Sequence, residues 1–294
     1  GKFKMQNDRL VVTIDDLGAE LVSIYDKKYS RELIWQGDPA WWKRQAPILF
    51  PNVGKFYGGE YLYQGRHYVQ DQHGFARDYV LERVEESPAS VTHRLVSNAE
   101  TRKVYPFDFE LMITHRLDGD KVDIQWQVKN TGDHPMHFTI GGHPGFNVPV
   151  LPDTEYSDYA LKFAEDQDEL HFIHIDMNTG TGLPDKVYTM TLTDHKYQLR
   201  KDLFDLDALV FDGGQIRQAG IVMPDGSDYL TLLCDGFPNF GIWAAPGAPF
   251  VCLEPWCGRC DNFGYEGELQ DKPGINSLNV DEAFKKVYSI VIGG

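Results

Sequence analysis

The sequence predicts an all-β protein, a fold class supported by three observations. Apolar and polar residues alternate with a period of two over several stretches, as in half-buried strands. The 294 residues include 28 Gly and 16 Pro, a composition rich in turns. Helical periodicity is confined to residues 201–209 and 281–286, where we expect short helices. We therefore expect antiparallel strands joined by turns.

The expected strands follow one another along the chain. Residues 10–14, 21–25 and 33–35 are short apolar runs separated by turn residues. Residues 109–117 and 122–128 alternate clearly and are joined by Asp118-Gly119-Asp120, which predicts a hairpin. A third strand, 136–140, leads into Gly141-Gly142-His143-Pro144-Gly145. His143 is thus expected at the end of a rigid strand.

Composition and charge exclude several classes of protein. With 42% hydrophobic residues the chain can bury a large core, and no linker or repeat divides it, so we expect one domain over residues 1–294. The net charge of -16 disfavours nucleic acid as a partner. No apolar run is long enough to span a membrane and the first residues lack a signal peptide's apolar core, so a cytoplasmic location is expected. The sequence leaves the oligomeric state open.

Polar residues that could take part in catalysis or binding lie in four Gly- or Pro-rich segments: 43–54, 72–77, 141–146 and 252–258. Loops at strand ends commonly carry functional groups. Glu254 is flanked by apolar residues on both sides, and an unpaired charge there would be costly to bury. This carboxylate therefore needs a partner or a chemical role.

Two other constellations have weaker support. His134, His137 and His143 offer a metal-ligand pattern, but His134 lies in the turn before the strand that carries the other two. Cys257 and Cys260 form a Trp-Cys-x-x-Cys sequence, but they lie outside the βαβ context that redox proteins give this motif. We expect thiols, no bound metal and no cofactor, since nucleotide-binding motifs are also missing.

Taken in order, the segments resemble the aldose 1-epimerase (galactose mutarotase-like) family, and more narrowly its LacX-type branch. The resemblance rests on residues 18–24, 33–39, 47–54, 73–77, 142–146 and 249–258. It implies a single antiparallel β-supersandwich that binds a sugar in an open cleft. It also implies a cofactor-independent isomerase that interconverts the α and β anomers of a hexose.

The family's functional residues transfer to positions in this chain. His143 resembles the general acid and Glu254 the general base, and we expect them on opposite sides of the sugar. The resemblance implies substrate contacts from Arg44, His73 and Arg77, and an acidic contact from Asp207 or, as second choice, Asp212. Phe75 and Trp256 are the aromatic residues expected to pack against the sugar.

Two alternatives to a free-hexose epimerase stay open. A hexose-6-phosphate 1-epimerase would need Arg44 and Arg77 to converge on a phosphate, which the net charge of -16 disfavours. A non-catalytic carbohydrate-binding protein could also use this scaffold, because a fold does not by itself fix a function.

Overall fold

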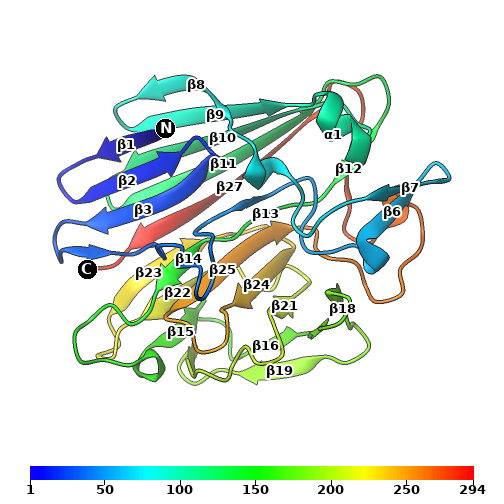
Figure 1. Cartoon of the computed structure of the whole chain (residues 1–294). Coiled ribbons are helices and arrows are strands. Elements are labelled where there is room, and N and C mark those ends of the chain that lie inside the picture. Colours follow the sequence, from blue (N-terminus) through cyan, green and yellow to red (C-terminus); the bar gives the residue numbers. More distant parts are fainter.

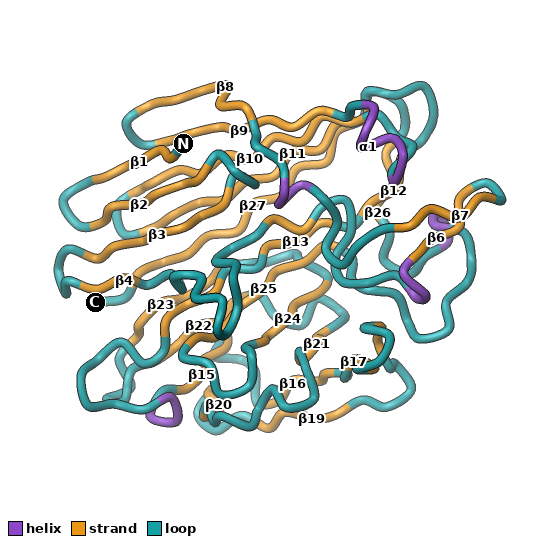
Figure 2. The backbone as a smooth tube through the Cα atoms, viewed as in Figure 1, coloured by secondary structure: helices purple, strands orange, loops and turns teal.

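A computed structural model describes all 294 residues, and strands and turns make up most of the chain (Figures 1 and 2). Its one α-helix is the short α1 (Ala99–Val104), and four single-turn 3₁₀ helices lie at Tyr57–Gly59, Ala76–Asp78, Tyr156–Asp158 and Leu269–Asp271. The predicted all-β class is confirmed. None of these helices is long and apolar enough to cross a membrane.

Three antiparallel sheets form the body of the molecule. The largest has nine strands in the order β20 (Lys196–Gln198), β15 (Ala160–Phe163), β22 (Gln218–Val222), β23 (Asp228–Leu233), β27 (Ala283–Ile292), β11 (Lys121–Asn130), β10 (Phe109–Asp118), β9 (Ser90–Val96) and β8 (Glu82–Ser87). The four-stranded sheet is a meander of β1 (Lys2–Gln6), β2 (Leu10–Asp15), β3 (Glu20–Asp26) and β4 (Arg31–Glu32).

The six-stranded sheet carries the residues of interest. It runs in the order β21 (Leu209–Phe211), β24 (Asn239–Trp243), β25 (Phe250–Cys257), β13 (Ile140–Gly142) and β5 (Ile48–Leu49), and β14 (Gly145–Asn147) also pairs with β25. Four two-stranded ribbons complete the fold: β6 (Glu60–Tyr63) with β7 (Arg66–Val69), β12 (Met136–Phe138) with β26 (Asn276–Leu278), β16 (Glu169–Phe172) with β19 (Tyr188–Thr191), and β17 (Ile175–Asp176) with β18 (Thr181–Gly182).

The hairpin predicted from alternation is confirmed. β10 and β11 pair from Phe109 opposite Asn130 to Asp118 opposite Lys121, so the turn falls at Gly119 and Asp120. Every second side chain of both strands is buried. The apolar ones among them join a single cluster of 69 buried residues drawn from all three large sheets.

Both predicted helices are wrong. Residues 283–292 form β27, which pairs with β11 on one side and with β23 on the other. A strand in the middle of a sheet gains hydrogen bonds on both edges, which outweighs weak helical propensity. Residues 201–207 form turns that bury Leu203 and Phe204 and end at Asp207, whose φ of 72° lies in the left-handed region.

Candidate active site

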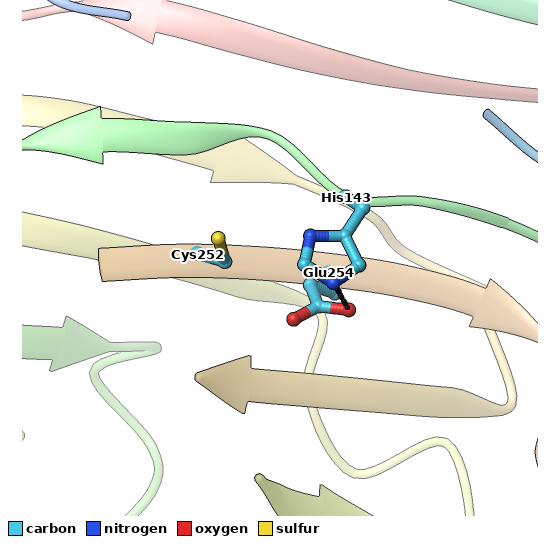
Figure 3. A group of neighbouring side chains, drawn as sticks. All are labelled: His143, Cys252 and Glu254. Carbon is cyan, nitrogen blue, oxygen red and sulfur yellow. Dashed lines mark ion pairs between the residues drawn. The ribbon is translucent and has the colours of Figure 1, made fainter. Parts of the chain in front are cut away.

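Two neighbouring strands bring His143 and Glu254 together. β13 pairs with β25 through Gly141 opposite Trp256, and His143 follows directly after β13. Glu254 lies within β25, and its Oε1 is 3.1 Å from His143 Nε2 (Figure 3). Both side chains are buried. The expectation that a sugar ring's width would separate them is therefore wrong, because they are in direct contact.

The pair forms part of the wall of a cavity of about 360 Å³, which we call the His143 cavity. This volume falls within the range of about 300–1,000 Å³ that is usual for small-molecule sites. Its wall consists of Trp42, Val53, Gly54, Lys55, Gln72, His73, Arg77, His143, Ile175, Met177, Gly180, Asp207, Ala208, Trp243, Glu254, Trp256 and Cys260. Six of the eight residues predicted for the site are among them: His73, Arg77, His143, Asp207, Glu254 and Trp256.

Trp256 lies flat across the six-stranded sheet because glycines occupy the positions beside it. A Cβ at Gly141 would be 2.4 Å from Trp256 Cδ1, and one at Gly241 would be 2.3 Å from Cζ2. Trp256 and Glu254 are two residues apart in β25, so their side chains lie on the same face of the sheet. The indole thus supplies an apolar surface next to the carboxyl group.

His73 enters the cavity from a tight turn. Gly74 has a φ of 71°, and a Cβ there would lie 2.3 Å from the carbonyl oxygen of Phe50, so only glycine fits. His73 itself has a φ of 64°. Its Nδ1 accepts a hydrogen bond from Gly54 N–H at 2.8 Å, and its ring centroid is 5.4 Å from that of His143. The turn therefore holds His73 in one orientation beside His143.

The two predicted arginines differ in position. Arg77 lines the His143 cavity, and its Nη2 donates a hydrogen bond to the carbonyl of Gln72 at 2.9 Å. Arg44 is not part of the cavity wall, and its Nη1 lies 3.1 Å from Asp78 Oδ1. Arg44 thus pairs with Asp78 instead of lining the cavity, although its charge is close enough to help lower the pKa of His143.

The structure separates the two candidate acidic contacts. Asp207 lines the His143 cavity, where its left-handed backbone turns the chain toward the pair. Asp212 instead contacts Arg259 at 2.9 Å and accepts a hydrogen bond from Asn239, both outside this cavity. Asp207, the first choice, is thus the carboxylate near the pair.

Phe75 does not line the cavity, so its predicted role as a sugar platform is not supported. Its ring packs against four aromatic rings, with centroids 5.8–6.4 Å away, those of Phe50, Tyr79, Tyr105 and Phe109. Because Phe75 and His73 both flank Gly74, the turn sends one side chain toward the cavity and the other toward the core.

The cavity wall also contains residues to which the sequence analysis assigned no role. Trp42 and Trp243 flank His143, with ring centroids 4.9 Å and 5.7 Å from its imidazole. Lys55 adds a cation to the wall. Trp42 lies directly before segment 43–54 and Lys55 directly after it. This closeness to the segment was the available sequence signal for a place in the cavity wall.

Burial controls the electrostatics of the pair. Burial, reinforced by the charges of Arg77 and Arg44, lowers the pKa of His143 to about 3. Burial and then the neighbouring Asp207 raise the pKa of Glu254 well above its usual value. Both effects disfavour charge and so favour a neutral imidazole beside a carboxylic acid, with one transferable proton between them. Burial likewise lowers the pKa of His73 well below its usual value.

The alternative sites set aside from the sequence do not form. His134 contacts Asp133, and His137 Nδ1 lies 2.7 Å from Ser277 Oγ, so neither joins His143 in a cluster of metal ligands. Cys257 and Cys260 are buried free thiols. The one group of at least three potential metal ligands consists of His143, Cys252 and Glu254.

The chain belongs to the aldose 1-epimerase family, whose model matches residues 1–276. It is 33% identical over 302 aligned residues to Protein LacX, chromosomal, from Lactococcus lactis subsp. lactis, and the alignment covers 99% of each chain.

Solved structures of similar proteins share the whole fold. A galactose mutarotase related enzyme from Lactobacillus acidophilus superposes with a TM-score of 0.93 at 31% identity, covering 100% of this chain and 98% of the other. A galactose mutarotase-like protein from Lactobacillus casei ATCC 334 gives a TM-score of 0.90 at 28% identity, covering 99% and 100%. The predicted galactose mutarotase-like β-supersandwich is confirmed.

Proposed function

We propose that this protein is an aldose 1-epimerase that interconverts the α and β anomers of a hexose. The observation that carries the proposal is the contact of 3.1 Å between His143 Nε2 and Glu254 Oε1 in the wall of a cavity large enough for one small molecule. Membership of the aldose 1-epimerase family supports it.

The reaction needs two proton transfers at neighbouring oxygens. One group must take the proton from the anomeric hydroxyl O1 while another protonates the ring oxygen O5, so that the C1–O5 bond opens to the aldehyde. Rotation about C1–C2 followed by closure then gives the other anomer. O1 and O5 are bonded to the same carbon, so two catalytic groups in contact can reach both oxygens. The closeness of His143 and Glu254 therefore suits this chemistry better than a wide separation would.

The pair meets the proton balance of the reaction. With His143 protonated and Glu254 ionised, the imidazolium donates to O5 and the carboxylate accepts from O1, which is the assignment that the resemblance implies. The neutral form of the pair, which burial favours, holds the same number of protons. A proton passed between the two groups converts one form into the other. The pair can therefore serve ring opening and ring closure alike.

The other residues of the wall would bind and orient the sugar. Trp256 offers a flat apolar surface for the C–H face of a pyranose. Arg77, His73 and Asp207 provide hydrogen-bonding groups for hydroxyls on the remaining sides. Such fixed positioning contributes to the rate by holding the anomeric centre against the catalytic pair.

Polarimetry tests the proposal. Freshly dissolved α-glucose and α-galactose should reach their equilibrium rotation faster with the protein than without it, and His143→Asn should remove the acceleration. If a broad panel of aldoses shows no acceleration, the protein is no epimerase. Sugar binding by calorimetry without acceleration would then support the non-catalytic carbohydrate-binding alternative.

A hexose 6-phosphate is the second candidate substrate, because Lys55 and Arg77 place two cations in the wall of the cavity. The net charge of -16 disfavours a dianion at long range. Comparing mutarotation of glucose with that of glucose 6-phosphate decides between them. A kcat/KM at least tenfold higher for the phosphorylated sugar, lost in Lys55→Gln, would favour the second candidate.

A further inference from the structure

Cys252 lies beside the catalytic pair but has no part in the proposed reaction. Cys252 and Glu254 are two residues apart in β25 and so lie on the same face of the strand. His143 follows the neighbouring strand β13 (Figure 3). One potential ligand atom of each residue, the Cys252 Sγ, a Glu254 carboxylate oxygen and a His143 ring nitrogen, lies within 4.8 Å of the other two. All three side chains are buried. His143 and Glu254 line the His143 cavity, and Cys252 belongs to the hydrophobic core beside them, so the cluster offers three different donors.

The spacing of these atoms is close to that of a metal site. Ligand atoms bound tetrahedrally to zinc, at about 2.0–2.3 Å from the ion, lie about 3.3–3.6 Å from one another. His143 Nε2 and Glu254 Oε1 are already 3.1 Å apart. The sulfur, at up to 4.8 Å, needs to approach by about 1 Å, which side-chain rotation of Cys252 can supply.

The donor types favour a zinc-like ion. A thiolate and an imidazole suit zinc better than magnesium or calcium, which prefer oxygen ligands alone. A thiolate and a carboxylate together cancel the charge of a divalent ion, as a buried site requires. Lys55 and Arg77 in the cavity wall oppose the entry of a cation and Asp207 favours it.

We propose that His143, Cys252 and Glu254 bind a zinc-like divalent cation and that the bound ion inhibits the protein. Binding forms metal–N, metal–S and metal–O bonds and releases to solvent the protons of the Cys252 thiol and of the Glu254 carboxyl group, with no change of oxidation state. The ion then occupies a ring nitrogen of His143 and the carboxylate of Glu254, the two groups that proton transfer requires. Only the inhibition rests on the proposed epimerase function, since metal binding does not depend on it.

Titration of the whole protein with Co²⁺ tests the site without reference to activity. A cobalt–thiolate bond gives a charge-transfer band in the near ultraviolet, and we expect it to saturate at one ion per chain. Zn²⁺ should displace the cobalt and abolish the band. The band should be lost in both Cys252→Ser and Cys252→Ala. It should persist in Cys234→Ser, a matched control because Cys234 is also a buried thiol but lies outside the cluster.

The second readout is inhibition by Zn²⁺, measured for each variant relative to its own metal-free rate. We expect Cys252→Ser to weaken the inhibition by more than about tenfold, and Cys234→Ser to leave it as in the wild type. A band that survives in the Cys252 variants, or no band in the wild type, overturns the proposal. If the wild type shows the band but no epimerase activity, the metal site stands and the proposed function fails.

Discussion

The substitution Gly241→Ala tests whether the placement of Trp256 matters for function. The new Cβ would lie 2.3 Å from Trp256 Cζ2, whereas carbon atoms in contact are at least about 3.5 Å apart. The indole must therefore shift by about 1 Å, and it can move only away from the sheet, into the His143 cavity. A misplacement of about 1 Å costs up to about 10²-fold in rate, which corresponds to about 2.7 kcal/mol. We expect kcat/KM for mutarotation to fall by about 10- to 10²-fold.

Polarimetry at several sugar concentrations, together with a thermal melt, measures this effect. Gly220→Ala is the matched control, because the Cβ added to this β22 residue would lie 2.6 Å from the carbonyl oxygen of Leu230 in β23, and neither residue belongs to the cavity wall. The control should lower the melting temperature and leave kcat/KM of the folded protein unchanged. Equal kcat/KM values for Gly241→Ala and the wild type would refute the role given to Trp256.

Three further predictions concern the pair, the core and acid stability. Glu254→Gln keeps the shape of the side chain but removes its transferable proton, so the mutarotation rate should fall by about 10²- to 10⁴-fold while circular dichroism stays native; a loss below tenfold would contradict the assignment. Phe75→Leu should lower the free energy of unfolding by about 1 kcal/mol or more and leave KM unchanged, since the ring packs in the core; a raised KM in sugar titrations would return Phe75 to the site. Burial lowers the pKa of His115 to about 3. The unfolded chain therefore takes up a proton below about pH 6.5 that the native chain does not, and this costs about 2 kcal/mol of stability at pH 5. In urea unfolding, His115→Leu should lose about that much less stability than the wild type between pH 7.5 and pH 5, and equal losses would show that His115 is not the source.

The long strands of the fold could be predicted because one period of alternation runs through them. Residues 109–130 show it plainly, and the buried side chains of β10 and β11 follow it residue by residue. Residues 281–286 were misread because only the last part of β27, from Tyr288 onward, alternates between buried and half-buried positions. The two neighbours that make β27 a central strand are distant in sequence.

Part of the candidate site could be predicted because residue types and their immediate neighbours identify its chemistry. His143 stands out at a strand end, and Glu254 stands out as a carboxylate among apolar neighbours. The sequence does not show in which direction the side chains of a turn point. His73 and Asp207 both reach the cavity through left-handed backbone conformations, which cost energy for residues other than glycine and are held by their surroundings.

Neighbours in space account for the remaining differences. Arg44 lies outside the cavity wall because Asp78, on another segment, pairs with it. Trp42 packs against His143 from a loop that precedes the recognised segment. The local sequence shows neither contact, since each depends on how the sheets and loops come together; for Trp42 the one available signal was its place next to segment 43–54.

The most direct test of the central claim is NMR exchange spectroscopy of an aldose at equilibrium. It follows the interconversion of the two anomers with no change in the total amount of either. We predict that wild-type protein raises the exchange rate between α and β anomers, and that His143→Asn and Glu254→Gln each return the rate almost to that of the sugar alone. An unchanged exchange rate with the wild type, or undiminished exchange in both variants, would contradict the claim that these two residues open and close the sugar ring.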